Sequence, residues 1–274
     1  MKNVCSDTLT APLLSWLAAP YFDWWSNPAA LRELEAATGG PWWLVGGSAF
    51  VMFAAWTACY FVSFQQARRD KSYSFPIVNV ALNLGWEFVF AFALLGPLPR
   101  FYFPLQWGHL LWVGFDSWNV AQIVKNGRGM QSSPFTQRWF GLILLGTFVL
   151  AMPAPYFFMR YTGDVMGVNA AMIIDVVMAA LFINLFANRQ GLRGLSFSGG
   201  VFRLIGDVSS FVFLYLWWPA QFDAQGAFAT CDAPAYAGIV EPRSYVFLYG
   251  MYVAATVLDA LYVALLHVRR RGGA

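Results

Sequence analysis

The chain alternates long apolar stretches with short polar connections. About 20 apolar residues are needed for a helix to cross roughly 30 Å of hydrocarbon. Seven stretches reach that length, at about 42–64, 75–96, 105–124, 139–160, 165–187, 201–219 and 244–267. The pattern predicts an all-α polytopic membrane protein: an N-terminal interfacial segment (1–41), a seven-helix transmembrane domain (42–267) and a basic tail (268–274).

Composition agrees with this interpretation. The chain is 59% hydrophobic and 11% charged, with a mean hydropathy of +0.53, whereas a soluble domain is about 25% charged. We therefore expect a multi-pass integral protein surrounded by membrane lipid. The inner membrane is the expected location in a bacterium, and the endoplasmic reticulum membrane in a eukaryote.

The basic residues predict an orientation. Loops 65–74 and 125–138 and the C-terminal tail each carry three of the 17 Lys and Arg residues, and the connection between the fifth and sixth spans carries Arg189 and Arg193, with Arg203 at the start of the sixth span. These four segments fall on the same side of a seven-span protein. Because cytoplasmic loops are enriched in Lys and Arg, the N-terminus is expected outside and the C-terminus in the cytoplasm. Because the basic residues are explained by membrane orientation, the net charge of +3 does not indicate nucleic-acid binding.

The first 41 residues and the cysteines leave alternatives open. The apolar run 12–20 follows Lys2 and could be a weak signal peptide. The aromatic residues Trp16, Trp24 and Trp25 favour an interfacial segment instead. Cys5 and Cys231 both fall on the predicted outer side, where they form either a disulfide or two free thiols. No Cys and His spacing resembles a metal site, so we expect no metal and no cofactor.

Acidic residues inside the apolar stretches are the strongest functional signal. A carboxylate near the bilayer centre costs about 2.5–3.5 kcal/mol on insertion scales. Such residues usually mark a proton path, an ion path or an acid–base site. Five positions of this kind occur: Glu87, Asp116, Asp175, Asp207 and Asp259.

Helical spacing places several polar residues on shared faces. Asn79, Asn83 and Glu87 recur every four residues, with Trp86 beside them. Two further faces follow the same logic: His109, Trp112, Asp116 and Asn119 in the third span, and Tyr245, Tyr249, Tyr252, Thr256, Asp259 and Tyr262 in the seventh. Because lipid offers no hydrogen-bond partners, these faces should point inward. They either join helices to one another or line a cavity.

Two reaction classes are excluded by what the spans lack. A retinal protein needs a Schiff-base lysine in its last helix, yet Lys2, Lys71 and Lys125 all lie outside the predicted spans. An enzyme that ionises a prenyl diphosphate needs clustered aspartates to hold Mg²⁺, and no DDxxD, DxxxD or DxDD run occurs. Isoprenoid chemistry here would have to start by protonation.

The stretch Asn83-Leu84-Gly85-Trp86-Glu87 resembles the N-x-x-W-E motif of the membrane-integral terpene cyclases of meroterpenoid and indole-diterpene pathways, which include the pyripyropene and paxilline cyclases. Asp259 followed by Tyr262 is similar to that family's second acidic site. The resemblance covers roughly residues 42–267. It implies a cyclisation without metal, in which an acid protonates an epoxide or alkene of a prenyl chain and a base or hydroxyl ends the cation cascade.

The resemblance and the helical faces together define the expected site. Glu87 and Asp259 are the expected catalytic pair, with either residue as the acid, and they should meet across one aromatic cavity. The expected substrate-binding residues are Asn83, Trp86, Trp112, Asp116, Asn119, Tyr252 and Tyr262. The expected partner is a prenylated or epoxidised isoprenoid small molecule, and the sequence indicates no oligomeric state.

Asp175 and Asp207 are expected to be structural, bonded to neighbouring helices or to arginines such as Arg203, which lies four residues before Asp207. A proton-coupled transporter or a seven-helix sensor is the rival interpretation, because intramembrane acids also form proton relays. The absence of an inverted repeat in the sequence argues against a transporter.

Overall fold

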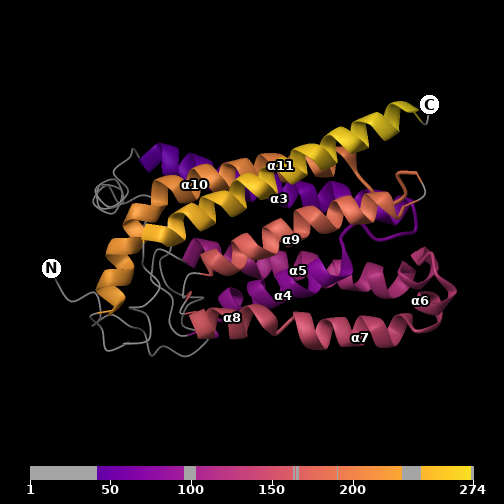
Figure 1. Ribbon diagram of the computed structural model, residues 1–274, viewed down its shortest axis with the longest axis horizontal. Helices are drawn as coiled ribbons and strands as arrows, with labels where there is room; N and C mark the ends of the chain where they lie inside the picture. Colours follow the sequence, from indigo (N-terminus) through magenta and orange to yellow (C-terminus); the bar gives the residue numbers. More distant parts are fainter. Residues whose placement is uncertain are drawn as a thin grey trace.

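The computed structural model describes residues 42–95, 103–162, 164, 167–189, 191–229 and 242–272 (Figure 1). These residues form helices joined by turns, with no strand among them. The helices are α3 (Trp42–Arg69), α4 (Ile77–Ala91), α5 (Phe103–Asn126), η4 (Arg128–Met130), α6 (Pro134–Arg138), α7 (Phe140–Ala151), α8 (Ala154–Thr162), α9 (Val168–Ala187), α10 (Phe197–Ala229) and α11 (Pro242–Gly272). The predicted interfacial segment, Cys5 and Cys231 lie outside the described residues.

Helix boundaries differ from the predicted spans at informative places. The fourth span is broken into α7 and α8, because Pro153 lacks the backbone N–H that would continue the helix. The loop expected at 220–243 is shorter, since α10 continues to Ala229 and α11 begins at Pro242. Helix α4 ends at Ala91, five residues before the predicted end of its span.

Four helical stretches of the described part of the chain are long and apolar enough to cross a membrane. They are Gly46–Arg69, Phe140–Thr162 across the α7–α8 break, Val168–Ala187 and Tyr249–Gly272. Helix α4 is apolar but shorter. The all-helical, membrane-type architecture is therefore confirmed, while the count of seven crossings stays a prediction.

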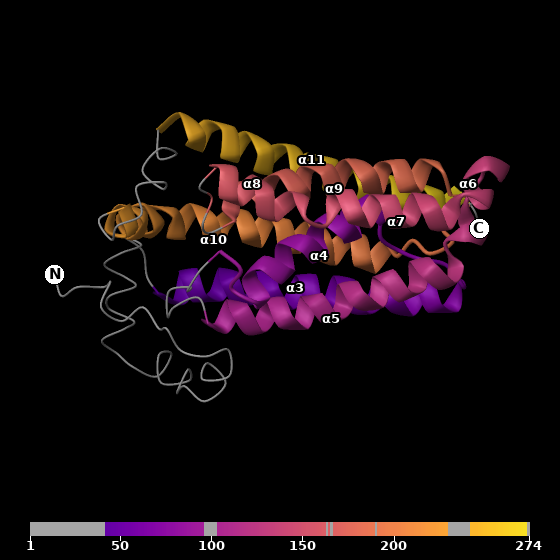
Figure 2. The same cartoon turned by 90° about the horizontal axis from the view of Figure 1, so that it is seen from below.

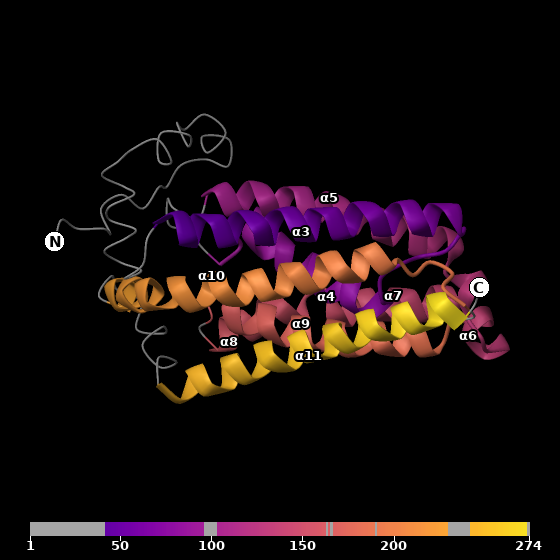
Figure 3. The ribbon, with the colours of Figure 1, turned by 90° about the horizontal axis from the view of Figure 1, so that it is seen from above.

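The long helices run side by side along the longest axis of the molecule (Figures 1 and 2). Helix α3 packs along α10, and α11 packs along α9. Viewed from above, α10 lies between α3 and α11 (Figure 3). Helix α4 occupies the middle of the bundle and contacts α5, α7, α8 and α9. The residues of the N-x-x-W-E stretch are therefore carried into the interior.

The basic connections gather at one end of the bundle. Arg193 donates a hydrogen bond to the backbone carbonyl of Asp70, and Arg189 donates one to that of Tyr73. Arg269 donates to the carbonyl of Phe186 and stacks 3.5 Å from the centroid of that residue's ring. The C-terminal helix, the α3–α4 turn and the α9–α10 turn therefore meet at the end that α6 also occupies (Figure 1).

Gly85 permits the closest helix approach around α4. A Cβ atom added at this position overlaps with the backbone carbonyl oxygen of Met152, at the α7–α8 break. Backbone atoms cannot rotate aside as a long side chain can. The glycine of the N-x-x-W-E stretch thus has a packing role of its own: it lets α4 lie directly against the break.

Gly85→Ala should therefore lower the free energy of unfolding by about 1–3 kcal/mol, the usual cost of overpacking a well-packed site. Gly146→Ala is the matched control, because a Cβ at Gly146 in α7 meets nothing within 4 Å; removing a helical glycine there should be neutral or slightly stabilising. Thermal unfolding of the two variants in detergent measures the difference. Equal melting temperatures would contradict the close approach.

Candidate functional site

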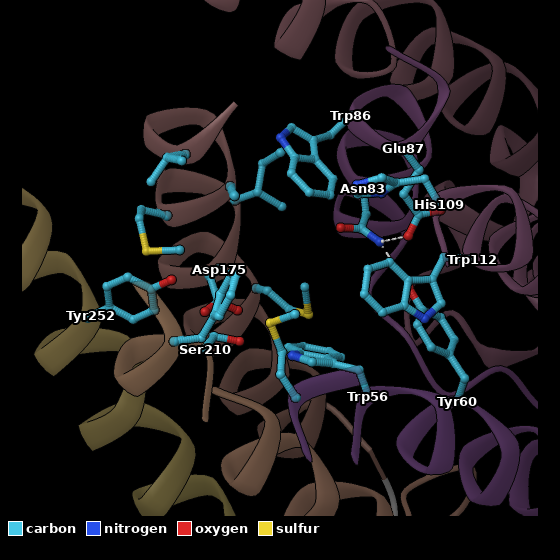
Figure 4. A pocket seen from close by; sticks show the side chains of 17 residues that line it. Trp56, Tyr60, Asn83, Trp86, Glu87, His109, Trp112, Asp175, Ser210 and Tyr252 are labelled. Atoms are coloured by element: carbon cyan, nitrogen blue, oxygen red, sulfur yellow. Dashed lines mark hydrogen bonds between the residues drawn. The ribbon is translucent and has the colours of Figure 1, made fainter. Parts of the chain in front are cut away.

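A cavity lies among α3, α4, α5, α9, α10 and α11 (Figure 4). Its walls are mainly aromatic and sulfur-containing side chains, among them Trp56, Trp86, Trp112, Met52, Met172 and Met178. Polar groups meet it from two sides. Figure 4 shows Glu87, Asn83 and His109 on one side, and Asp175, Ser210 and Tyr252 on the other.

The Asn83 carboxamide organises the first polar side. Its Nδ2 atom lies 2.7 Å from Glu87 Oε1, 2.8 Å from Asp116 Oδ2 and 2.9 Å from the Tyr60 hydroxyl. Asn119 Nδ2 donates to the other Asp116 oxygen at 3.0 Å. Asn83 reaches Glu87 because residues four apart on α4 share a face. The same amide also contacts Tyr60 on α3 and Asp116 on α5, and so joins three helices.

Glu87 is held on one side and free on the other. Its side chain is 1% exposed, and Oε1 accepts the Asn83 hydrogen bond. Its second carboxyl oxygen, Oε2, has no hydrogen-bond partner among the described residues. Because Glu87 lines the cavity, this carboxyl is oriented by the protein while still able to exchange a proton with a ligand.

A tight turn before α9 positions Trp86. The Trp86 indole N–H donates to the backbone carbonyl of Gly167 at 3.0 Å, and Gly167 adopts a left-handed φ of 64°. The Asp164 carboxyl accepts hydrogen bonds from the backbone N–H groups of Val168 and Ala170. Burial raises the pKa of Asp164 to about 6, although these bonds favour its charged form. The turn, which sequence reasoning did not single out, thus holds one wall of the cavity.

The second polar side is backed by a buried ionic cluster. Arg203 on α10 donates to Asp259 Oδ1 on α11, and each side chain is 1% exposed. Arg203 therefore pairs with Asp259 and not with Asp207, which was one of the partners that the sequence allowed. Both Asp207 oxygens lie buried without a hydrogen-bond partner in the described structure. The Arg203 guanidinium also lies 4.3 Å from the centroid of the Phe182 ring.

The predicted site residues separate into two layers. Those that line the cavity are Asn83, Trp86, Glu87, Trp112 and Tyr252. Those that lie behind it are Asp116, Asn119, Asp259 and Tyr262. Asp116 and Asn119 support the Glu87 side, whereas Tyr262 packs against Phe182 and Phe186. The catalytic and binding roles of all nine stay predictions.

Asp175 changes the expected picture most. The sequence favoured it as a structural residue, yet it lines the cavity, whereas Asp259 turns toward Arg203 and does not. The reason is packing: α11 lies along both α9 and α10, which directs Asp259 to the α10 guanidinium. Tyr60, Trp56 and Ser210 were also missed, although Ser210 shares one face of α10 with Arg203 and Asp207 at i, i+4, i+7 spacing.

The model of the Pyr4-like transmembrane terpene cyclases matches residues 41–250. The chain belongs to this family. The match includes α3 to α10, which supply every cavity-lining residue except Tyr252 on α11. Membership makes the chain a membrane protein and a terpene cyclase homologue.

Curated relatives agree with the family. A Pyr4-family terpene cyclase of Annulohypoxylon moriforme, mfmH, is 27% identical over 60% of this chain and 67% of its own length. The terpene cyclase ascF of Acremonium egyptiacum is 24% identical over 78% of both chains. The terpene cyclase macJ of Penicillium terrestre is 25% identical over 71% of this chain and 78% of its own. No solved structure matches.

In this cyclase homologue, Asn83→Leu should lower the free energy of unfolding by about 1–3 kcal/mol, because two buried carboxyl groups lose their shared donor. Asn79→Leu is the matched control one turn earlier, since the Asn79 carboxamide oxygen is buried without a partner; it should be nearly neutral. Chemical unfolding in detergent compares the two. A larger loss for Asn79→Leu would argue against the Asn83 network.

Proposed function

We propose that this protein cyclises a prenyl chain by protonating its terminal epoxide or alkene, without a metal ion. The observation that supports the proposal best is the Glu87 carboxyl: it is buried, oriented by Asn83 and open to an aromatic cavity. The family match and the named cyclase relatives support a terpenoid substrate.

Glu87 has the surroundings of a general acid. It shares the Asn83 amide with Asp116, so two carboxyl groups lie close together in an apolar interior. The described residues put no Lys or Arg along this cavity to balance their charges. Two neighbouring carboxylates in such a place repel each other, so the pair retains at least one proton. A proton donor positioned in this way typically contributes about 10²- to 10⁴-fold to a rate.

The cavity walls suit the cation that follows. Protonation of an epoxide oxygen breaks a C–O bond and leaves a carbocation, which the next double bond of the chain attacks. The faces of Trp56, Trp86 and Trp112 can stabilise this charge by cation–π attraction. An apolar lining also keeps water from capturing the cation early. The cascade ends when a carbon–hydrogen bond gives its proton to a base and a C=C bond forms.

Asp259 remains the second proposed catalytic residue, but its carboxyl does not line the cavity and would act on the substrate only through neighbouring side chains. It lies behind the cavity in the Arg203 cluster, and Asp175 is the member of that group that reaches the lining. On this proposal Asp259 influences the last proton transfer through its neighbours rather than by contact with the chain.

We also infer that all seven predicted segments cross the membrane, with the C-terminus in the cytoplasm. The gathering of the α3–α4 turn, the α9–α10 turn and Arg269 at one end supports this topology, because basic ends face the cytoplasm.

Reporter fusions at residues 130 and 228 should report opposite sides of the membrane. Residue 130 lies in η4 at the basic end, and residue 228 lies near the end of α10, at the other end of the bundle (Figure 1). A phosphatase reporter should be active only at 228, and a fluorescent reporter that folds in the cytoplasm only at 130. Activity of one reporter at both positions would contradict seven crossings.

Glu87→Gln should lower turnover by about 10²- to 10⁴-fold, because the amide keeps the shape but has no acidic proton. The assay incubates membranes with an epoxidised farnesyl-quinol compound and follows an isomer of unchanged mass. Asp70→Asn is the control: it makes the same chemical change in the α3–α4 turn, where the carboxyl accepts from the Gly194 N–H far from the cavity. Cyclisation by Glu87→Gln at the wild-type rate would rule out the proposed acid. Proton-coupled uptake without any product isomer would instead favour a transporter.

A further inference from the structure

The side of the cavity opposite Glu87 has the features of a separate binding subsite. Asp175, Ser210 and Tyr252 come from three helices, α9, α10 and α11, and face the same space (Figure 4). We call these three residues the Asp175 end. The proposed protonation at Glu87 uses none of these three residues, and of the three only Asp175 has been related to the last proton transfer.

The Tyr252 hydroxyl lacks a partner. The side chain is 3% exposed, and its oxygen is buried without a hydrogen bond to any described residue. A buried hydroxyl without a partner is destabilising. Ser210 donates its own proton to the carbonyl of Gly206 at 2.8 Å, so its oxygen is still able to accept a hydrogen bond. The Asp175 end therefore offers unused hydrogen-bonding capacity toward the cavity.

Charge balance decides which ligands this end can take. Arg203 supplies one positive charge, and its ion pair with Asp259 uses it. Asp175 and Asp207 have no second buried cation among the described residues around the cluster. Unpaired carboxylates are costly in a low-dielectric interior, so a further negative charge is unfavourable at this end. The Asp175 carboxyl accepts hydrogen bonds, and it also donates one when it is protonated.

An anionic ligand fits this end poorly. Phosphate groups are bound in proteins by Arg, Lys or backbone N–H clusters, and none of the cavity-lining residues is Arg or Lys. The three groups present are instead complementary to an uncharged ligand that carries hydroxyl or carbonyl oxygens.

We propose that the Asp175 end binds the uncharged, oxygen-bearing head group to which the prenyl chain is attached, while the reactive end of the chain lies at Glu87. This assignment rests on the proposed cyclase function. Holding the head at a fixed point orients the chain along the aromatic walls, and such orientation is a large part of catalysis in intramolecular reactions. The Arg203–Asp259 pair supports the subsite from behind.

The test compares the binding of three compounds with the same epoxidised farnesyl chain. One carries a hydroquinone head with free hydroxyl groups, one carries the same head with both hydroxyls methylated, and one carries a diphosphate. Binding is measured as quenching of tryptophan fluorescence in the purified Glu87→Gln protein, which retains Trp56, Trp86 and Trp112 in the cavity walls. The use of binding rather than turnover separates this test from the test of the proposed function.

The free-hydroxyl compound should bind about 3- to 10-fold more tightly than its methylated partner for each hydrogen bond that it makes, and more tightly than the diphosphate. Adding Tyr252→Phe or Asp175→Leu should move the ratio between the free and methylated compounds toward one. Tyr161→Phe is the matched control, since its hydroxyl lies on a 93% exposed side chain; it should leave the ratio unchanged.

Two results would overturn the subsite. The first is a ratio between the free and methylated compounds that stays at its Glu87→Gln value when either cavity substitution is added, and the second is tighter binding of the diphosphate. If the expected ratios appear but wild-type membranes form no isomer, the subsite stands as a binding site and the cyclase proposal fails.

Discussion

The Asn83 carboxamide is the interaction on which the reactive side of the cavity depends. Inside a membrane-spanning bundle no water is available to satisfy a buried carboxyl, so each must find its partners within the protein. Asn83 contacts Glu87, Asp116 and Tyr60 at once. Without it, two acids on neighbouring helices would face each other with no donor between them. The position of Glu87, and so the proposed proton donor, follows from this single side chain.

In the second acidic cluster, the partner of a buried carboxyl group is a cation rather than an amide. Arg203 places a full positive charge among Asp175, Asp207 and Asp259, and it bonds to Asp259. The two clusters therefore differ in character: the first has an amide donor and no cation, and the second has a cation and more acids than it can neutralise. A proton can leave the first cluster for a ligand, whereas the second is better suited to hold a polar group or to receive a proton.

Much of the fold was predictable from periodicity alone. Each apolar stretch of about 20 residues corresponds to a helical region, because backbone groups in lipid must bond within their own segment. The four-residue spacing of Asn79, Asn83 and Glu87 correctly placed Asn83 and Glu87 on one inward face. Pro153 separates α7 from α8 within the fourth stretch. The exact ends of α4 and α10 were not predictable, since they depend on turns and on neighbouring helices.

The limits of sequence reasoning are clearest at the second cluster. Spacing along one helix suggested that Arg203 pairs with Asp207, but the pair forms with Asp259 on another helix. Which helices are neighbours is a property of packing, and no periodicity within α10 encodes it. For the same reason Asp175, which is surrounded in sequence by apolar residues, was judged structural although it meets the cavity.

The positions of Asp259 and Asp175, which the sequence did not predict, determine which polar groups the cavity presents to a ligand. Since Asp259 is occupied by Arg203, the cavity receives one carboxyl from each cluster, Glu87 and Asp175, on opposite sides of apolar walls. A ligand with one polar end and a long hydrocarbon chain matches that arrangement in a way that a small polar solute does not. A transported ion or amino acid would leave most of the aromatic lining without a complementary surface. The distribution of polar and apolar atoms around the cavity thus favours a prenylated compound over a small transported solute, independently of the family match.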